Sequence, residues 1–179
     1  MVNWNGAGMK RFFITDERGV TGIEFAFVAL PIAIMLIGMA EMSLMFAAGS
    51  ALHGATEVAA RQIRTGAVQT SGDPQQTFDN LLCEHVDTYI SCEELMYEVI
   101  DMPDGSFSTA SNYQPDFDEE GELQAVGFSP GVENDVVLIR VAYRYPIKTP
   151  LFQPLLSDLP GNRKLLMTTV VLQNEPYNF

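Results

Sequence analysis

The residues that could perform chemistry in this chain are few and far apart. His53 and His85 are its only histidines, and neither has a neighbour at the spacing of a general-base or metal-ligand motif. The sequence contains no HExxH, GxSxG, Walker or GxGxxG motif. We therefore expect that the protein is not an enzyme, holds no cofactor or metal ion and takes no small-molecule substrate.

Two cysteines, Cys83 and Cys92, lie in the part of the chain that we expect outside the cytoplasm, where a disulfide is stable. Their spacing fits neither a redox CxxC motif nor a zinc site. A helix through both would hold them about 13 Å apart on opposite faces, whereas a disulfide requires Cα atoms within about 7 Å. Either the helix ends near Ile90 and the chain turns back, or both thiols are free.

Acidic residues dominate the middle of the chain. The net charge is −13, and neither Lys nor Arg occurs between Thr65 and Ile139. Such a surface repels phosphate, so we expect no nucleic-acid partner. The stretch DFDEEGELQAVG at 116–127 begins like a calcium-binding EF-hand loop, but Gly127 replaces the required bidentate Glu. A solvated acidic loop is the better interpretation.

The most apolar segment is FAFVALPIAIMLIGMAEMSLMF, at about 25–46, in which Glu41 is the only charge. Its length matches the roughly 20 residues of a membrane-spanning helix. The basic residues Lys10, Arg11 and Arg18 precede it, which predicts a cytoplasmic N-terminus and a periplasmic C-terminal part. A secretory signal cleaved near 49–51 is the alternative, but Glu41 inside the apolar segment argues against it.

Helical patterning continues beyond this segment and predicts one helix from Val20 to Thr65, with Gly66 just after its end. Alanines recur every fourth residue, which suits close helix–helix packing in lipid or in an assembly, or simply reflects helix propensity. They are Ala47, Ala51, Ala55 and Ala59.

The remaining sequence predicts a small α+β domain. A second, amphipathic helix is expected from 74 to about 90, with Asp73 as its N-cap and Pro74 at its first position. Strand patterns cover 95–102, 135–145 and 165–173, with a weaker candidate at 122–128. The fold class is thus a long N-terminal transmembrane and assembly helix, a second helix, and a mainly antiparallel sheet of three to four strands.

Loops are predicted at 103–122 and at 148–164, the latter with Leu151, Phe152, Leu155 and Leu156 as apolar anchors. Three regions follow from these patterns. A leader comprises 1–19, the long helix 20–66 and the α+β domain 67–179.

Arg18-Gly19 closes a short basic leader, and Glu24 falls at position five if the chain is cut between Gly19 and Val20. This arrangement resembles the processing region of type IV prepilins. RGVTGIEFAFVALPIAIMLIGMAEM at 18–42, AARQIRTG at 59–66 and NEPY at 174–177 are more closely similar to TadE-like pseudopilins of the Tad (tight adherence) pilus and secretion system. One departure is Phe25, where Tad pilins commonly have Tyr.

The resemblance implies a minor pilin in the bacterial inner membrane that takes part in building a fibre for adhesion or secretion. Its implied partners are a prepilin peptidase, other Tad pilins or pseudopilins, the inner-membrane assembly platform and membrane lipid. Cleavage would create an amine at Val20, with which the Glu24 carboxylate can pair on the same or a neighbouring chain. The rival interpretation is a signal-anchored protein whose periplasmic domain has a binding or structural role unrelated to pili.

Overall fold

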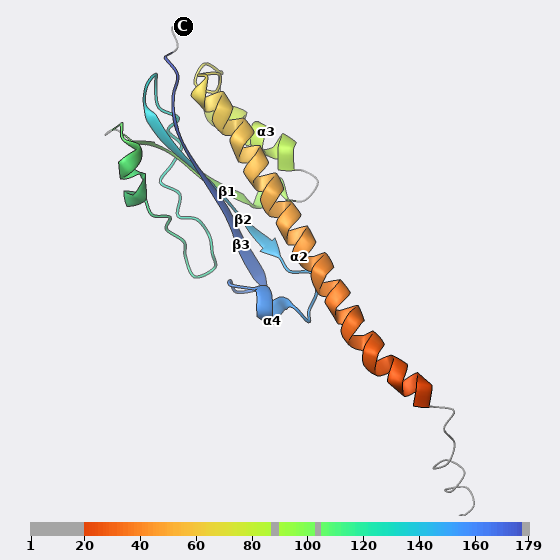
Figure 1. Ribbon diagram of the computed structural model, residues 1–179. Coiled ribbons are helices and arrows are strands. Elements are labelled where there is room, and N and C mark those ends of the chain that lie inside the picture. The colour runs from red at the N-terminus through yellow and green to blue at the C-terminus, as the bar shows by residue number, and fades with distance from the viewer. Residues whose placement is uncertain (1–19, 87–89, 103–104, 177–179) are drawn as a thin grey trace, which may run out of the picture. The chain divides into compact units, whose positions relative to one another are not determined.

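The computed structural model describes residues 20–86, 90–102 and 105–176 (Figure 1). The chain forms two compact units, Met1–Ala40 and Glu41–Phe179, with the division inside the first described helix. This helix, α2, runs from Val20 to Arg64. It ends where predicted, because Gly66 adopts a left-handed φ of 79° and donates its N–H to the Ile63 carbonyl at 3.0 Å.

Three antiparallel strands form the sheet of the second unit, in the order β1-β2-β3. They are β1 (Leu95–Met102), β2 (Val136–Pro146) and β3 (Arg163–Gln173). The register pairs Leu95 with Tyr143 and Val136 with Gln173, so β2 is the central strand. The predicted α+β class is confirmed, with three strands.

The fourth strand candidate, 122–128, is wrong. Only isolated bridges occur there, one of them between Val99 and Phe128. The Val99 N–H donates to the Gly127 carbonyl at 3.0 Å, and the Ser129 N–H donates to the Val99 carbonyl at 2.8 Å. Gly127 has a φ of 141°, which breaks an extended strand, so the backbone of this segment pairs with β1 only around Val99.

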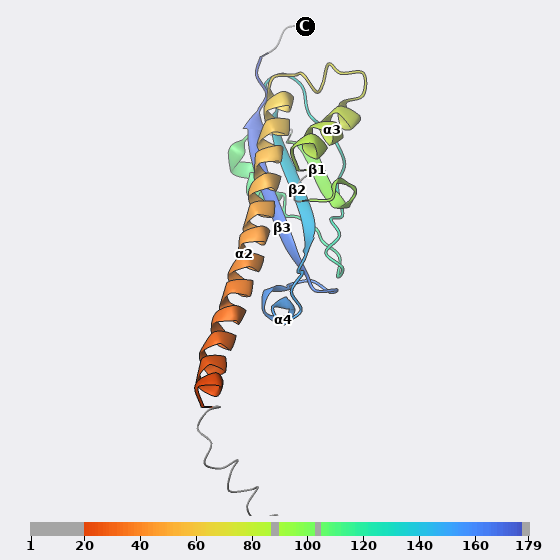
Figure 2. The ribbon, with the colours of Figure 1, turned by 90° about the vertical axis from the view of Figure 1, so that its right-hand side faces the viewer.

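The second half of α2 and helix α3 (Pro74–Val86) cover one face of the sheet (Figures 1 and 2). Alternate residues of β2 point into this core because side chains alternate along a strand. Its central members include Leu52, Ile63, Phe78, Leu82, Val137, Ile139 and Val141. The helix α3 starts as predicted, since the Asp73 carboxylate accepts the Gln76 N–H at 3.1 Å. Its described part ends at Val86, and 87–89 lie outside the described residues.

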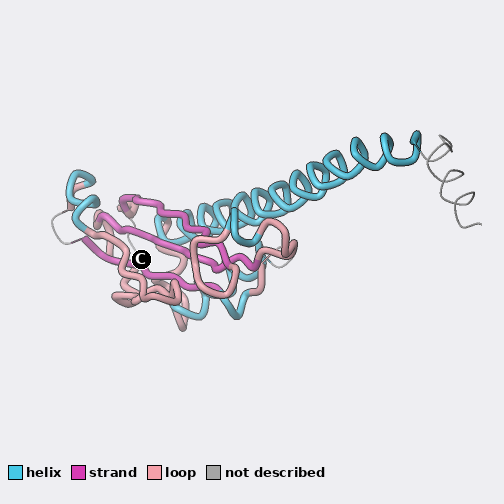
Figure 3. The backbone as a smooth tube through the Cα atoms, turned by 90° about the horizontal axis from the view of Figure 1, so that it is seen from below, coloured by secondary structure: helices cyan, strands magenta, loops and turns pink. Residues whose placement is uncertain are grey.

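Long loops and the short 3-10 helix η3 (Phe107–Asn112) cover the opposite face of the sheet (Figure 3). A smaller core forms there, in which half-buried Ala110 and Tyr113 pack on strand residues. The buried members are Ile100, Met102, Val136 and Leu138. Both faces of β2 are therefore buried, which explains why its sequence is almost continuously apolar.

The connection between β2 and β3 contains a short helix, α4 (Gln153–Leu156). Of the four apolar anchors predicted here, Leu156 packs against the main core and Phe152 is half-buried. The prediction is wrong for the other two, because Leu151 is 60% exposed and Leu155 is 77% exposed.

Candidate functional site

The first half of α2, residues 20–40, presents bulky apolar side chains to its surroundings. Phe25 and Phe27 are 73% and 76% exposed, and Leu30 is 65% exposed. Among the described residues, α2 is the one helix long and apolar enough to cross a membrane. A soluble surface rarely carries such a continuous apolar area, so this half suits a single-pass membrane anchor or a signal sequence.

The residues of the predicted processing and assembly site lie at the start of this half. Val20 is the first residue of α2 and Glu24, one turn further on, is exposed. Glu24 has no hydrogen-bond or ion-pair partner among the described residues. Gly19, on the other side of the predicted cut, lies outside the described residues. The helix therefore holds the Glu24 carboxylate one turn from the atom that cleavage would convert into an amine.

Glu41 has the opposite environment, which sequence reasoning missed because the only signal was an isolated charge in an apolar segment. Its side chain is only 3% exposed. One carboxylate oxygen accepts the Lys148 N–H at 2.9 Å, and the other accepts the Thr149 N–H at 3.2 Å and the Thr149 hydroxyl at 2.7 Å. Three donors thus satisfy a buried charge, and they fasten the β2–β3 connection to the helix.

The alanines of the second half pack mainly against the protein's own sheet. Ala55 and Ala59 are 1% and 0% exposed and belong to the main core. The expectation that they serve packing in lipid or in an assembly is therefore wrong for these two, because the sheet already occupies that face. Small side chains let the helix backbone approach the strands closely. Cleavage near 49–51 would also remove Glu41 and Ala48 from this buried set.

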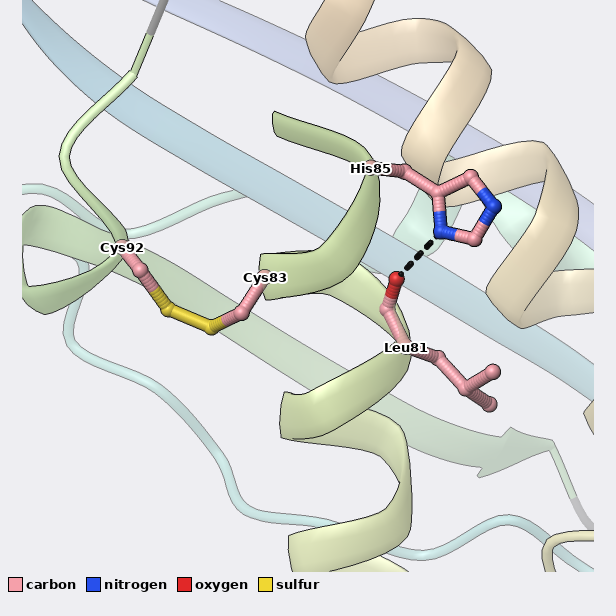
Figure 4. Close-up of a disulfide and its surroundings, with 4 residues drawn as sticks. All are labelled: Leu81, Cys83, His85 and Cys92. Atoms are coloured by element: carbon pink, nitrogen blue, oxygen red, sulfur yellow. Dashed lines mark hydrogen bonds between the residues drawn. A yellow bond between two sulfur atoms is a disulfide. The ribbon is translucent and has the colours of Figure 1, made fainter. Parts of the chain in front are cut away.

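A disulfide joins Cys83 on α3 to Cys92, which begins the 3-10 helix η2 (Cys92–Glu94) just before β1 (Figure 4). The two Cα atoms are 5.3 Å apart, so the chain turns back between them. Of the two alternatives left open by the sequence, the disulfide is therefore the correct one. The bridge ties the end of α3 to the start of the sheet. It lies within the described part of the α+β unit, far in sequence from Glu24.

The histidines make ordinary structural contacts. The His85 ring nitrogen Nδ1 lies 2.9 Å from the Leu81 carbonyl of its own helix (Figure 4). The His53 Nδ1 lies 3.0 Å from the Thr168 hydroxyl and links α2 to β3. In the described part of the chain neither ring also contacts an acidic side chain, which would be the third member of a catalytic triad.

A buried ion pair, Glu98 with Arg140, lies under the long loops on the outer face of the sheet. The second oxygen of Glu98 accepts the Val126 N–H at 3.1 Å, and the Arg140 guanidinium donates to the Tyr113 carbonyl at 2.6 Å. Each member of the pair therefore also binds a loop backbone. The pair fixes the loops rather than forming an open site, since both side chains are at most 4% exposed.

The acidic stretch around Asp118 holds its own turn together. The Asp118 carboxylate accepts the N–H groups of Glu120 at 3.0 Å and Glu122 at 2.7 Å. The described residues contain no group of three or more side chains arranged to bind a metal ion.

Tyr97 has the most perturbed ionisation outside the apolar half of α2. It packs against Phe78 and Phe128, with ring centroids 5.1 and 6.3 Å away. Burial and a hydrogen bond to Asp79 raise the pKa of its phenol to about 12. The position is a packed aromatic cluster between α3 and β1, so the shift reports burial rather than a catalytic role.

Comparison with known proteins finds no match to this chain among protein-family models, curated proteins or solved structures.

Proposed function

We propose that this protein is a TadE-like pseudopilin, a minor pilin that takes part in assembling a Tad-type pilus for adhesion or secretion. The observation that carries the proposal is the combination at the start of α2. Arg18-Gly19 precedes Val20, Glu24 follows at position five, and the next 16 residues are uncharged. The apolar half of the helix leaves these side chains exposed, as a subunit that packs by its helix in a membrane and then in a fibre requires.

The second unit, Glu41–Phe179, supports a structural role rather than a catalytic one. Its buried charges, Glu41 and the Glu98–Arg140 pair, bind backbone groups of the protein itself. Its disulfide suits an oxidising compartment such as the periplasm. The proposed partners are accordingly a prepilin peptidase, other Tad pilins, the inner-membrane assembly platform and lipid.

Glu24 would act after processing. Cleavage after Gly19 would free the amine of Val20, the one cation in a surrounding of apolar side chains. A carboxylate in such a surrounding costs several kcal/mol when unpaired. Pairing Glu24 with this amine, on the same subunit or its neighbour, would set the register between adjacent helices.

Intact mass and N-terminal sequencing of the membrane-extracted protein test the processing step. With a prepilin peptidase co-expressed, we expect a chain that starts at Val20, and without it a chain that starts at Met1. Gly19→Val should block the cut, whereas the matched control Gly22→Val should not, since a Cβ at Gly22 meets no atom within 4 Å. A start at Met1 with active peptidase would indicate a plain signal anchor, and a start near Ala51 a secreted domain.

A further inference from the structure

The turn between β2 and β3 has two apolar sides, and only one of them packs against the core. We name residues 149–156 the leucine turn. On its inner side Leu156 packs against the main core and Phe152 is half-buried. On its outer side Leu151 and Leu155 are 60% and 77% exposed. Both pairs have the i, i+4 spacing that places side chains on a common face of a helical turn.

The outer side has an unusual composition for a surface turn. Pro150 and Pro154 are also exposed, and no charged residue occurs from Thr149 to Ser157. Turns that face water favour Asp, Asn, Ser and Gly. Backbone hydrogen bonds define the conformation of this turn, because the Phe152 N–H donates to the Thr149 carbonyl at 3.0 Å and the Ser157 N–H to the Gln153 carbonyl at 3.0 Å. Exposure of the leucines is therefore part of the fold.

The leucine turn is fastened at a defined level along α2. Glu41 binds the backbone of Lys148 and Thr149, so the turn begins beside the first residue after the apolar half. Residues 20–40 would extend about 31 Å as a helix, which is close to the roughly 30 Å hydrocarbon core of a bilayer. A helix that fills the core from Val20 to Ala40 brings Glu41 to the boundary between acyl chains and headgroups.

The exposed helix residues that follow Glu41 are consistent with a position of Glu41 at this boundary. Met42 and Phe46 are 47% and 78% exposed. The five steps from Glu41 to Phe46 rise about 7.5 Å along the helix, which is comparable to the thickness of one headgroup layer. Phe and Leu are side chains that surface-bound helices bury at the boundary between headgroups and acyl chains. Lys148, beside the turn, is exposed and can reach lipid phosphates.

We propose that the leucine turn is a second membrane contact, in which Leu151 and Leu155 insert into the surface of the bilayer that the apolar half of α2 spans. The occupant of this surface is phospholipid. The inference rests on the membrane anchorage contained in the proposed function. A second membrane contact on the α+β unit would restrict the tilt of that unit on the bilayer more than the anchor helix alone does.

Fluorescence quenching by lipids brominated on their acyl chains tests this contact on the full chain in vesicles. The chain has one tryptophan, Trp4, so Trp4→Phe provides a silent background. Into it we would place Leu155→Trp as the probe and Leu30→Trp as the anchor reference. The matched control is Val132→Trp, at an aliphatic residue 65% exposed that precedes β2, at the sheet end opposite the leucine turn.

We expect brominated lipid to quench Leu30→Trp strongly, Leu155→Trp clearly and Val132→Trp hardly at all. Equal quenching of Leu155→Trp and Val132→Trp, with Leu30→Trp still quenched, would overturn the second contact and leave the anchor intact. Loss of quenching at Leu30→Trp as well would overturn both the anchor and the inference. The leucines are exposed, so these substitutions should leave the fold unchanged, and circular dichroism checks this.

Discussion

The two halves of α2 belong to one helix but differ in the size and the exposure of their side chains. Residues 20–40 carry large apolar side chains that stay exposed. The half from Glu41 to Arg64 buries eight side chains, and Ala48, Ala55, Ala59 and Ala60 are four of them. Small residues occur where the helix approaches the sheet, whereas bulky apolar residues occur where the side chains stay exposed. The two halves therefore differ in side-chain volume and not only in hydrophobicity.

Two glutamates mark this difference most clearly. Glu24 is exposed and has no partner among the described residues, whereas Glu41 is 3% exposed and accepts three hydrogen bonds. A satisfied carboxylate serves the fold of its own chain, and an unsatisfied one is available to another group. Substitutions should therefore separate stability from assembly.

The largest effect on stability is expected for Glu41→Ala. It leaves two half-buried backbone N–H groups and the Thr149 hydroxyl without their acceptor, which should lower the free energy of unfolding by about 2–4 kcal/mol. Denaturant titration of the full chain in detergent measures this change. Glu57→Ala, at an exposed position on the same helix, is the control and should stay within about 0.5 kcal/mol. Equal stability of the two variants would contradict the role given to Glu41.

The disulfide should contribute slightly less to the free energy of unfolding than Glu41 does. Replacing Cys83 and Cys92 by Ala removes a bridge across a sequence separation of 9, which should cost about 2–3 kcal/mol. The loss of stability should fall on the α+β unit, because the bridge joins α3 to η2, just before β1. Thermal unfolding with and without the bridge checks this, and a double variant that unfolds like the native chain would show that the core alone holds α3.

One substitution made in both halves tests the volume argument. Ala59→Leu adds bulk at a position 0% exposed against the sheet, which should destabilise the protein by about 1–3 kcal/mol. Ala33→Leu adds the same bulk at an exposed position of the apolar half and should change little. Stability measurements on the two variants side by side decide the point. A tolerated Ala59→Leu would mean that α2 can move away from the sheet.

A smaller effect should appear at alkaline pH. The folded protein holds the pKa of Tyr97 at about 12, above the usual 10.0, so the native state keeps a proton that the unfolded state loses. The stabilisation is complete below pH 10 and is lost as the pH rises through 10 towards 12. Tyr97→Phe should therefore flatten the decline of stability in this window. An unchanged slope would assign the decline to another group.

Local signals allowed much of the α+β unit to be predicted from sequence. Asp73-Pro74 fixed the start of α3 and Gly66 the end of α2, since caps depend on a few adjacent residues. The three strands were predicted within two residues because their apolar runs are flanked by turn residues.

The features that were missed depend on contacts between distant parts of the chain. The Glu41 bonds join residues 107 and 108 positions apart, which no local pattern indicates. The outward direction of Leu151 and Leu155 depends on where the turn is fastened, so composition alone suggested buried anchors. The segment 122–128 has strand-forming residues, but the φ of Gly127 and the loop bonds to Glu98 prevent pairing.

The smallest effect on stability, and the most direct test of the account, is expected for Glu24→Ala. We would measure processed protein in the membrane and in sheared surface fibres of cells that carry the complete pilus system. The account predicts a variant that is cut before Val20 and stays within about 0.5 kcal/mol of native stability, yet is lost from the fibre fraction and impairs piliation. Normal piliation with Glu24→Ala would contradict the claim that the exposed half of α2 is the assembly element and Glu24 its register contact.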